Sequence, residues 1–326
     1  MGYSDNARAF SRIPVVDQVR LEDRVSFLYL EHAQVVQDRT GVWAIREGEP
    51  GLDGQRSPNG PDKEHVQIPV GGICVIMLGP GTSVTQPAMT SMANSGATVM
   101  FTGGGGMPAY ASAVPLTSSS RWAQAQARMW ANDVALLQAA RHLYLTRFPA
   151  FPTEVAITLN AMRGLEGRMV RDTYQSCARN AGQRYFKRDP TADDPVNTAL
   201  NVANGILYGC AASACATLAV NPALGIIHCG NARALLFDLA DVYKTTISIP
   251  AAFRAASEAD PAQAVRKDIR AQVHRRRLLP AMVALLCEIL ADHLDGADRG
   301  DQLMGDGGLV PGHTNYAPEL DMTEAD

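Results

Sequence analysis

A histidine and two aspartates lie close together in the stretch Gly225–Lys244, which reads GIIHCGNARALLFDLADVYK. His228 comes just before a helical pattern, and Asp238 and Asp241 are three residues apart within that pattern. Residues at this spacing are neighbours on a helix, about 5–6 Å apart at Cβ, so both carboxylates are expected to leave the same face. The flanking positions are apolar, and buried carboxylates need a compensating cation. The stretch therefore predicts part of a metal site.

The other half of this site is expected on a helix that reads RGLEGRMVRDTY and contains Glu166. Because Arg163 shares a helix face with Glu166, a plain ion pair within the helix is the alternative interpretation. Glu166, His228, Asp238 and Asp241 together supply three carboxylates and an imidazole, a set that suits Mg²⁺ or Mn²⁺. Zinc is disfavoured, because the sequence has no thiolate cluster and no HExxH spacing.

The charge distribution indicates a polyanionic ligand. The 326-residue chain has a formal net charge of −4, yet residues 121–280 hold 20 Lys and Arg against 12 Asp and Glu. Residues 292–326 hold one Arg against nine acids. A basic body of this kind favours a polyanion such as nucleic acid. The alternative for each basic group is a solvated helix face. The expected phosphate contacts are Arg163, Arg171, Arg266, Lys267, Arg270 and the run Arg275–Arg277.

These residues must be positioned by an α+β chain, in which a small, mostly β domain precedes an all-α domain. Runs of β-branched and aromatic residues predict strands at 24–30, 34–38, 41–45, 66–70, 73–78, 97–101 and 109–111. A short helix is predicted over 87–95, and helical spacing predicts longer helices over 122–148, 154–182, 195–220, 234–244, 250–256, 261–277 and 278–294.

Three segments follow from this division. Residues 1–116 form the predicted N-terminal β domain, with a mobile insertion at 46–65 that is rich in Gly, Pro and charge. Residues 117–296 form the predicted α-helical catalytic domain. Residues 297–326 form an acidic tail whose composition is typical of disorder.

Two apolar or glycine-rich motifs have a plain interpretation. The run Gly103–Gly106 invites a phosphate-loop reading, but no Lys-Ser/Thr follows and no helix begins there, so a flexible turn is favoured. Val202–Ile227 is long and apolar enough to span a bilayer, yet Asn204, Tyr208 and the Asn221–Pro222 break interrupt it. A helix buried on all sides of the helical domain explains it better, and we expect no membrane partner.

The cysteine pattern and the N-terminal sequence predict a cytoplasmic protein. The six cysteines show no CxxC spacing, and the sequence MGYSDNARAF lacks the apolar run of a signal peptide. Reduced, mostly buried thiols are therefore expected. Cys229 could be a soft metal ligand beside His228, but a packing role is favoured.

Several sequence blocks make the chain resemble a known family. They are LEDRVSFLYLEHAQV, IMLGPGTSV, VMFTGGGGMPAYAS, RGLEGRMVRDTY, NGILYGCAASA and GIIHCG…FDLADVYK. In this order they resemble the CRISPR-associated integrase-endonuclease of spacer acquisition, in the form that accompanies type I-E systems. The resemblance covers roughly residues 20–280. It implies a dimer-forming N-terminal β domain and a C-terminal helical domain that holds one divalent ion.

The resemblance also implies roles for single residues. The metal ligands of the family fall on Glu166, His228 and Asp241, and a companion active-site carboxylate falls on Asp238. Tyr208 matches a tyrosine over the 3′ single-stranded DNA end, and Lys244 and Arg163 match basic residues around the DNA. Asn231 and Pro108-Ala109 depart from the family, which tends to have basic residues there.

The function implied is insertion of a short DNA duplex, the prespacer, into the leader-repeat region of a CRISPR array. In this reaction a 3′-hydroxyl attacks a phosphodiester in a transesterification that needs Mg²⁺ or Mn²⁺. The partners implied are a second copy of the chain and a small companion adaptation protein. The alternatives are a stand-alone metal-dependent nuclease on branched or single-stranded DNA, and a non-catalytic DNA-binding scaffold.

Overall fold

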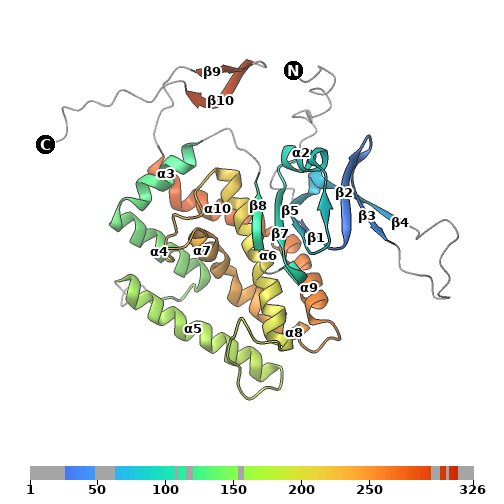
Figure 1. Ribbon diagram of the computed structural model, residues 1–326. Helices are drawn as coiled ribbons and strands as arrows, with labels where there is room; N and C mark the ends of the chain where they lie inside the picture. The colour runs from blue at the N-terminus through green and yellow to red at the C-terminus, as the bar shows by residue number, and fades with distance from the viewer. Residues whose placement is uncertain are drawn as a thin grey trace, which may run out of the picture.

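The computed structural model describes residues 26–47, 63–106, 109–114, 120–152 and 158–294, together with two short strands near the C-terminus. The N-terminal lead-in, residues 48–62 of the predicted insertion, Pro108 and most of the acidic tail lie outside the described residues. The described part has an N-terminal β-strand region followed by a helical region, which confirms the predicted α+β class (Figure 1).

Two four-stranded sheets form the N-terminal region. The first has the strand order β1-β5-β7-β8 and the second the order β4-β3-β2-β6. Strands β1, β5 and β7 run parallel and β8 pairs antiparallel with β7. In the second sheet β2, β3 and β4 form an antiparallel meander, and the short β6 lies parallel to β2. The bounds are β1 (Ser26–Leu30), β2 (Ala33–Asp38), β3 (Gly41–Glu47), β4 (Lys63–Ile68), β5 (Ile73–Leu78), β6 (Ser83–Val84), β7 (Thr98–Thr102) and β8 (Ala109–Ala113).

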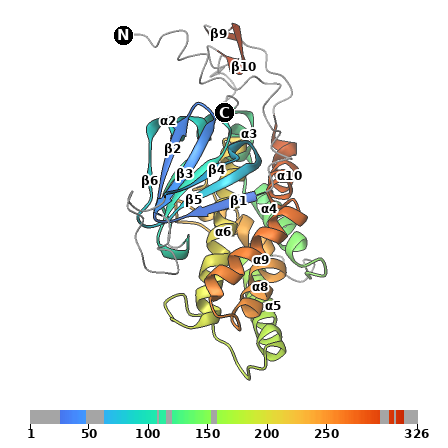
Figure 2. The same cartoon turned by 90° about the vertical axis from the view of Figure 1, so that its right-hand side faces the viewer.

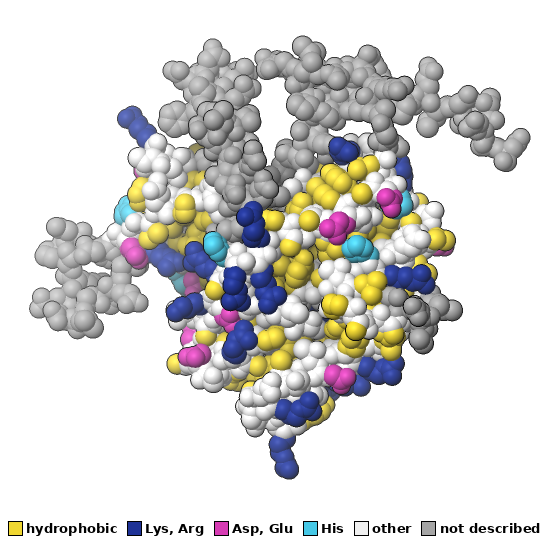
Figure 3. Space-filling model, turned by 180° about the vertical axis from the view of Figure 1, so that it is seen from behind, with side chains coloured by type: hydrophobic (Ala, Val, Ile, Leu, Met, Phe, Trp, Pro, Cys, Tyr) yellow, Lys and Arg dark blue, Asp and Glu magenta, His cyan; other side chains and the backbone are white. Residues whose placement is uncertain are grey.

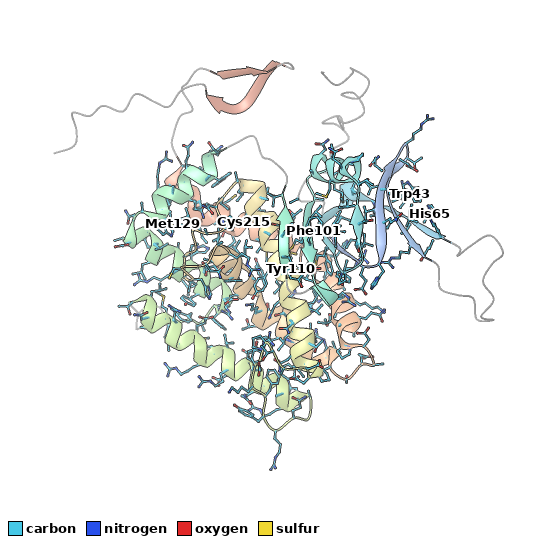
Figure 4. The ribbon with its side chains drawn as sticks, viewed as in Figure 1. Trp43, His65, Phe101, Tyr110, Met129 and Cys215 are labelled. Atoms are coloured by element: carbon cyan, nitrogen blue, oxygen red, sulfur yellow. The ribbon has the colours of Figure 1, made fainter. Side chains whose placement is uncertain are left out.

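Strand β5 is buried along its whole length because it serves two cores. Side chains alternate across a strand, and here Val75 and Met77 join the core of the helical region. Ile76 and Leu78 join a second core with α2 (Gln86–Asn94) and the meander sheet. In Figure 4, Trp43 on β3 and His65 on β4 lie on the side of the β region that faces away from the helices. The first sheet is therefore the layer that joins the β region to the helices.

The helical region is built around α6. This helix is buried on nearly every face and packs against α7, α8, α9 and α10 as well as β5 and β7 (Figures 1 and 2). By length and composition α6 could cross a membrane, but 83% of its apolar window is buried inside the protein, as the sequence predicted. The helices are α3 (Arg121–Trp130), α4 (Asp133–Arg147), α5 (Leu159–Asn180), α6 (Pro195–Leu218), α7 (Ala234–Tyr243), α8 (Ile249–Ala255), α9 (Pro261–Arg275) and α10 (Leu278–Leu290).

The single helix predicted over 122–148 is wrong, because α3 and α4 are separate helices. Asn132 lies between them in an extended conformation, and its side-chain oxygen accepts hydrogen bonds from the backbone N–H groups of Val134 and Ala135. An asparagine that caps the following helix in this way ends the preceding one. The apolar spacing continues through the break, which is why the pattern hides it.

The glycine run forms a turn, as the sequence predicted, and the acidic tail contains two paired strands. The glycine run is a short helical turn, Gly104–Gly106, in which Gly105 has a φ of 70°. Its N–H donates to the hydroxyl of Tyr29 at 2.9 Å, so the run makes a structural contact and no phosphate loop. In the acidic tail, β9 (Gln302–Gly305) and β10 (Gly308–Thr314) pair antiparallel, which the disorder-like composition does not predict.

Candidate active site

Asp238 on α7 is fully buried and organises the loop that precedes this helix. Its Oδ2 accepts hydrogen bonds from the backbone N–H of Ile226 at 2.6 Å and of Ile227 at 3.1 Å. Its Oδ1 accepts from the backbone N–H of His228 at 3.0 Å and lies 2.6 Å from the Nδ1 of the same residue. Backbone amides and one imidazole therefore compensate this buried carboxylate. Asp238 therefore needs no metal ion of its own for compensation.

His228 is held in one orientation by this contact. An ionised carboxylate can only accept, so Nδ1 carries a proton, and in the neutral ring Nε2 keeps the lone pair that could bind a metal ion. The hydrogen bond to Asp238 raises the pKa of His228, and burial opposes this increase only in part. Gly225 makes the tight loop possible, because a Cβ there would lie 2.2 Å from the carbonyl oxygen of His228.

Asp241 points to a different place from Asp238. Its Oδ1 lies 2.5 Å from Nζ of Lys244, which follows α7 in a π-helical turn over Lys244–Ser248. This oxygen is buried, and the Lys244 ammonium is its charged partner. Burial alone would lower the pKa of Lys244, but the negative charge of Asp241 and contact with Tyr208 raise it. Nζ also lies 2.8 Å from the Tyr208 hydroxyl, so Tyr208 and Lys244 form one polar group beside Asp241.

Glu166 on α5 and Asp241 both lie close to one arginine, which the sequence analysis did not identify. Nη1 of Arg147, in the last turn of α4, contacts Oε1 of Glu166 and lies 3.9 Å from Oδ2 of Asp241. The arginine side chain is only 5% exposed, so this is a buried ion pair. The alternative pair of Glu166 with Arg163 is not among the ion pairs of the described residues. Glu166 and Asp241 are thus brought together around Arg147.

The side chains of this site include donor atoms of the kinds that bind a divalent ion. Among the described residues, no three His, Cys, Asp or Glu side chains lie close enough together to hold a metal ion. The chemistry of the donors nevertheless fits: two carboxylates converge on one buried cation, and the Nε2 atom of the neutral His228 ring is left available as a ligand. These are hard oxygen ligands and one nitrogen, as Mg²⁺ or Mn²⁺ would need.

The predicted phosphate contacts separate into two groups. Arg163 and Arg171 on α5 and Arg270 on α9 are exposed, as are Lys267 and the run Arg275–Arg277. Figure 3 shows Lys and Arg side chains gathered on one face of the molecule. Arg266 differs, because its guanidinium lies over the ring of Tyr29, 4.9 Å from the ring centre, and its Nη1 is buried without a hydrogen bond. This arginine therefore contacts the β region and faces the solvent only in part.

Sequence reasoning missed two residues of the site, Arg147 and Tyr144. The Tyr144 hydroxyl lies 3.5 Å from Oε2 of Glu166, and burial raises the pKa of this tyrosine. Both residues lie in a helix whose pattern is dominated by apolar spacing, and neither belongs to a motif.

All six cysteines are free thiols, and the Cys229 side chain is exposed.

The comparisons with known proteins agree with one another. A family model described as CRISPR associated protein Cas1 matches residues 150–263. A CRISPR-associated endonuclease Cas1 of Thermus thermophilus is 34% identical over 285 residues, which cover 85% of this chain and 81% of the relative. The CRISPR-associated endonuclease Cas1 of Escherichia coli is 28% identical over 291 residues, which cover 85% and 88% of the two chains.

Solved structures show the same similarity in three dimensions. A crystal structure of TtCas1 in complex with DNA superimposes with a TM-score of 0.71 at 34% identity, covering 89% of this chain and 100% of that one. A casposase bound to its integration product superimposes with a TM-score of 0.61, covering 82% of this chain and 91% of that one. Its identity of 12% makes this second likeness evidence of the fold alone.

Proposed function

The chain belongs to the Cas1 family of CRISPR-associated endonucleases, and from this premise we propose that it is a divalent-metal-dependent DNA endonuclease and integrase. It would insert prespacer DNA into a CRISPR array by transesterification from a 3′-hydroxyl. The observation that carries the proposal is the convergence of Glu166 and Asp241 on one buried cation, next to an imidazole of fixed orientation.

The proposed metal ligands are Glu166, His228 through Nε2, and Asp241. A divalent ion bound there would lower the pKa of the attacking hydroxyl and stabilise the charge that develops on the phosphoryl oxygens. Asp238 would act as a positioning residue, because its oxygens hold the His228 loop and ring.

The chain's own cations would orient the DNA. Lys244 and Tyr208 present an ammonium and a hydroxyl 2.8 Å apart, beside Asp241, where a phosphate and a terminal nucleotide could bind. The half-buried ring of Tyr208 packs edge-on against Phe237 at 5.3 Å, which fixes its plane. The exposed arginines Arg163, Arg171 and Arg270 would contact the phosphates of the longer duplex.

The proposal is tested with purified Asp241→Ala and His228→Ala variants in a strand-joining assay on a repeat-containing plasmid. Both variants should lose metal-dependent joining while keeping their fold. Strand joining by Asp241→Ala at the wild-type rate would refute the proposal. Cleavage of branched DNA without any joined product would instead favour a stand-alone nuclease.

A non-catalytic DNA-binding scaffold is the second candidate. It is favoured by the finding that, within the described ranges, no three ligand side chains lie within reach of one ion. Elemental analysis of protein purified with Mn²⁺ and a DNA duplex separates the two: a scaffold would retain no manganese beyond that bound by the DNA alone, whereas the proposed enzyme would.

We also propose the finer assignments that the resemblance implies. They are the type I-E form, a homodimer formed through residues 1–116, a catalytic region at 117–296 and a complex with a small companion adaptation protein. Cytoplasmic location goes with this function. Co-purification with the protein encoded beside this one, followed by the joining assay, tests the complex.

A further inference from the structure

Both proposed metal-binding carboxylates already contact a cation of the chain itself. Arg147 contacts Glu166 directly and Asp241 at 3.9 Å. Lys244 lies 2.5 Å from the other oxygen of Asp241. The side chains involved are largely buried, with exposed fractions of 5% for Arg147, 17% for Lys244 and 19% for each carboxylate. Their charges therefore act on one another with little screening by solvent.

The four charges cancel. Glu166 and Asp241 contribute two negative charges, and Arg147 and Lys244 contribute two positive ones. The guanidinium cannot lose its proton in a protein, and the ion pairs of Arg147 among the described residues are those with Glu166 and Asp241. A divalent ion that joined this group would leave a net charge of +2, or of +1 when the buried Asp238 carboxylate behind His228 is counted. A net positive charge in a partly buried place is unfavourable without an anion.

A DNA phosphate supplies that anion. Lys244 is shared between Asp241 and the hydroxyl of Tyr208, so it can turn toward a phosphate that arrives beside the tyrosine. Arg147 is held more deeply and stacks on Phe148, with 5.0 Å between its Cζ and the ring centre. Arg147 is therefore held in place, whereas Lys244 can bind the phosphate.

We propose that Arg147 and Lys244 hold the carboxylate pair neutral, so that a divalent ion and a DNA phosphate each bind weakly alone and strongly together. This inference rests on the proposed function, because it concerns the same site. Coupling of this kind is reciprocal: the factor by which DNA strengthens metal binding equals the factor by which the metal strengthens DNA binding.

The test is the affinity for Mn²⁺, measured by calorimetry on the full chain with and without a DNA duplex that has 3′-dideoxy ends. Such ends cannot be joined, so binding is measured without turnover. For the wild type, the Kd for Mn²⁺ should fall at least about tenfold when DNA is present. For Arg147→Met the Kd without DNA should already be at least about tenfold lower, and the effect of DNA should shrink.

Two matched variants separate charge from packing. Arg147→Lys keeps the positive charge and should keep the weak metal binding of the wild type without DNA. Arg254→Met removes an exposed arginine that pairs with Asp268 and should change neither affinity. If Arg147→Met fails to fold, as judged by its unfolding transition, Lys244→Met removes the second cation and should tighten Mn²⁺ binding in the same way.

The outcomes distinguish this inference from the proposed function. A wild type that binds no Mn²⁺, with or without DNA, contradicts the proposed metal-dependent function itself. A wild type that binds Mn²⁺ equally well with and without DNA overturns only the coupling. The same holds for a folded Arg147→Met whose affinity is unchanged or weaker. If neither charge variant folds, the effect of DNA on the wild type decides.

Discussion

Replacing Asp238 by asparagine tests the idea that this carboxylate builds the His228 loop. In the wild type its two oxygens accept from three backbone N–H groups and from the imidazole. An asparagine keeps one oxygen, and its NH₂ group would face a backbone N–H of the loop. Leaving that buried donor unpaired and losing the charge-assisted bonds should cost about 2–4 kcal/mol.

The assay is thermal unfolding of the metal-free protein in a chelating buffer. A loss of this size should lower the unfolding temperature by about 4–8 °C. Asp268→Asn is the control, because Asp268 is more exposed and accepts from side chains only, those of Arg254 and Gln272. It should shift the transition by much less.

The effect should also depend on pH. The pKa of His228 is raised in the folded protein by its bond to Asp238. The stability that this bond contributes is therefore fully present below the ordinary histidine pKa of about 6.5 and is lost as the pH rises through the folded pKa. The difference between wild type and Asp238→Asn should be larger at about pH 6 than at about pH 9. A variant that unfolds like the wild type at both pH values would refute the reasoning.

Three further predictions use other contacts. Gly225→Ala should lower the unfolding temperature by several degrees and displace the His228 ring, because the new Cβ would lie 2.2 Å from the carbonyl oxygen of His228. An NMR signal of the His228 ring that matches the wild type would contradict this. Asn132→Ala should cost about 0.5–2 kcal/mol of unfolding free energy by removing the cap of α4, measured by urea denaturation; no loss would show that the cap is dispensable. DNA affinity should fall steeply between about 50 and 200 mM salt, and Arg270→Ala should reduce that dependence by about one counterion; a flat salt response would argue against this surface.

Much of the fold followed from local pattern. Strand β5 was predicted with its bounds, and α6 was predicted within two residues at its C-terminal end. Both are long apolar runs whose burial decides their form. The break between α3 and α4 was missed because Asn132 ends one helix through a side-chain bond that apolar spacing does not reveal.

Sequence by itself selected the residues that are proposed to carry the chemistry. Motif and residue type selected Glu166, His228, Asp238 and Asp241, and helix geometry placed the two aspartates near each other. Helix geometry did not tell the two aspartates apart; only the family resemblance assigned Asp241 as a ligand and Asp238 as its companion. Two residues three positions apart on an α-helix differ by about 60° around the helix axis. Only the packing decides that Asp238 faces the loop amides and that Asp241 faces Lys244 and Arg147.

The tertiary structure alone supplied Arg147, one of the two cations of the site. Arg147 ends α4 and lies 19 residues before Glu166, on a different helix from either carboxylate, and no spacing rule connects it with them. A buried guanidinium is stable only when it is paired with anions. The packing of α4 against α5 and α7 places Glu166 and Asp241 beside it. The electrostatics of this site are thus a property of three helices together.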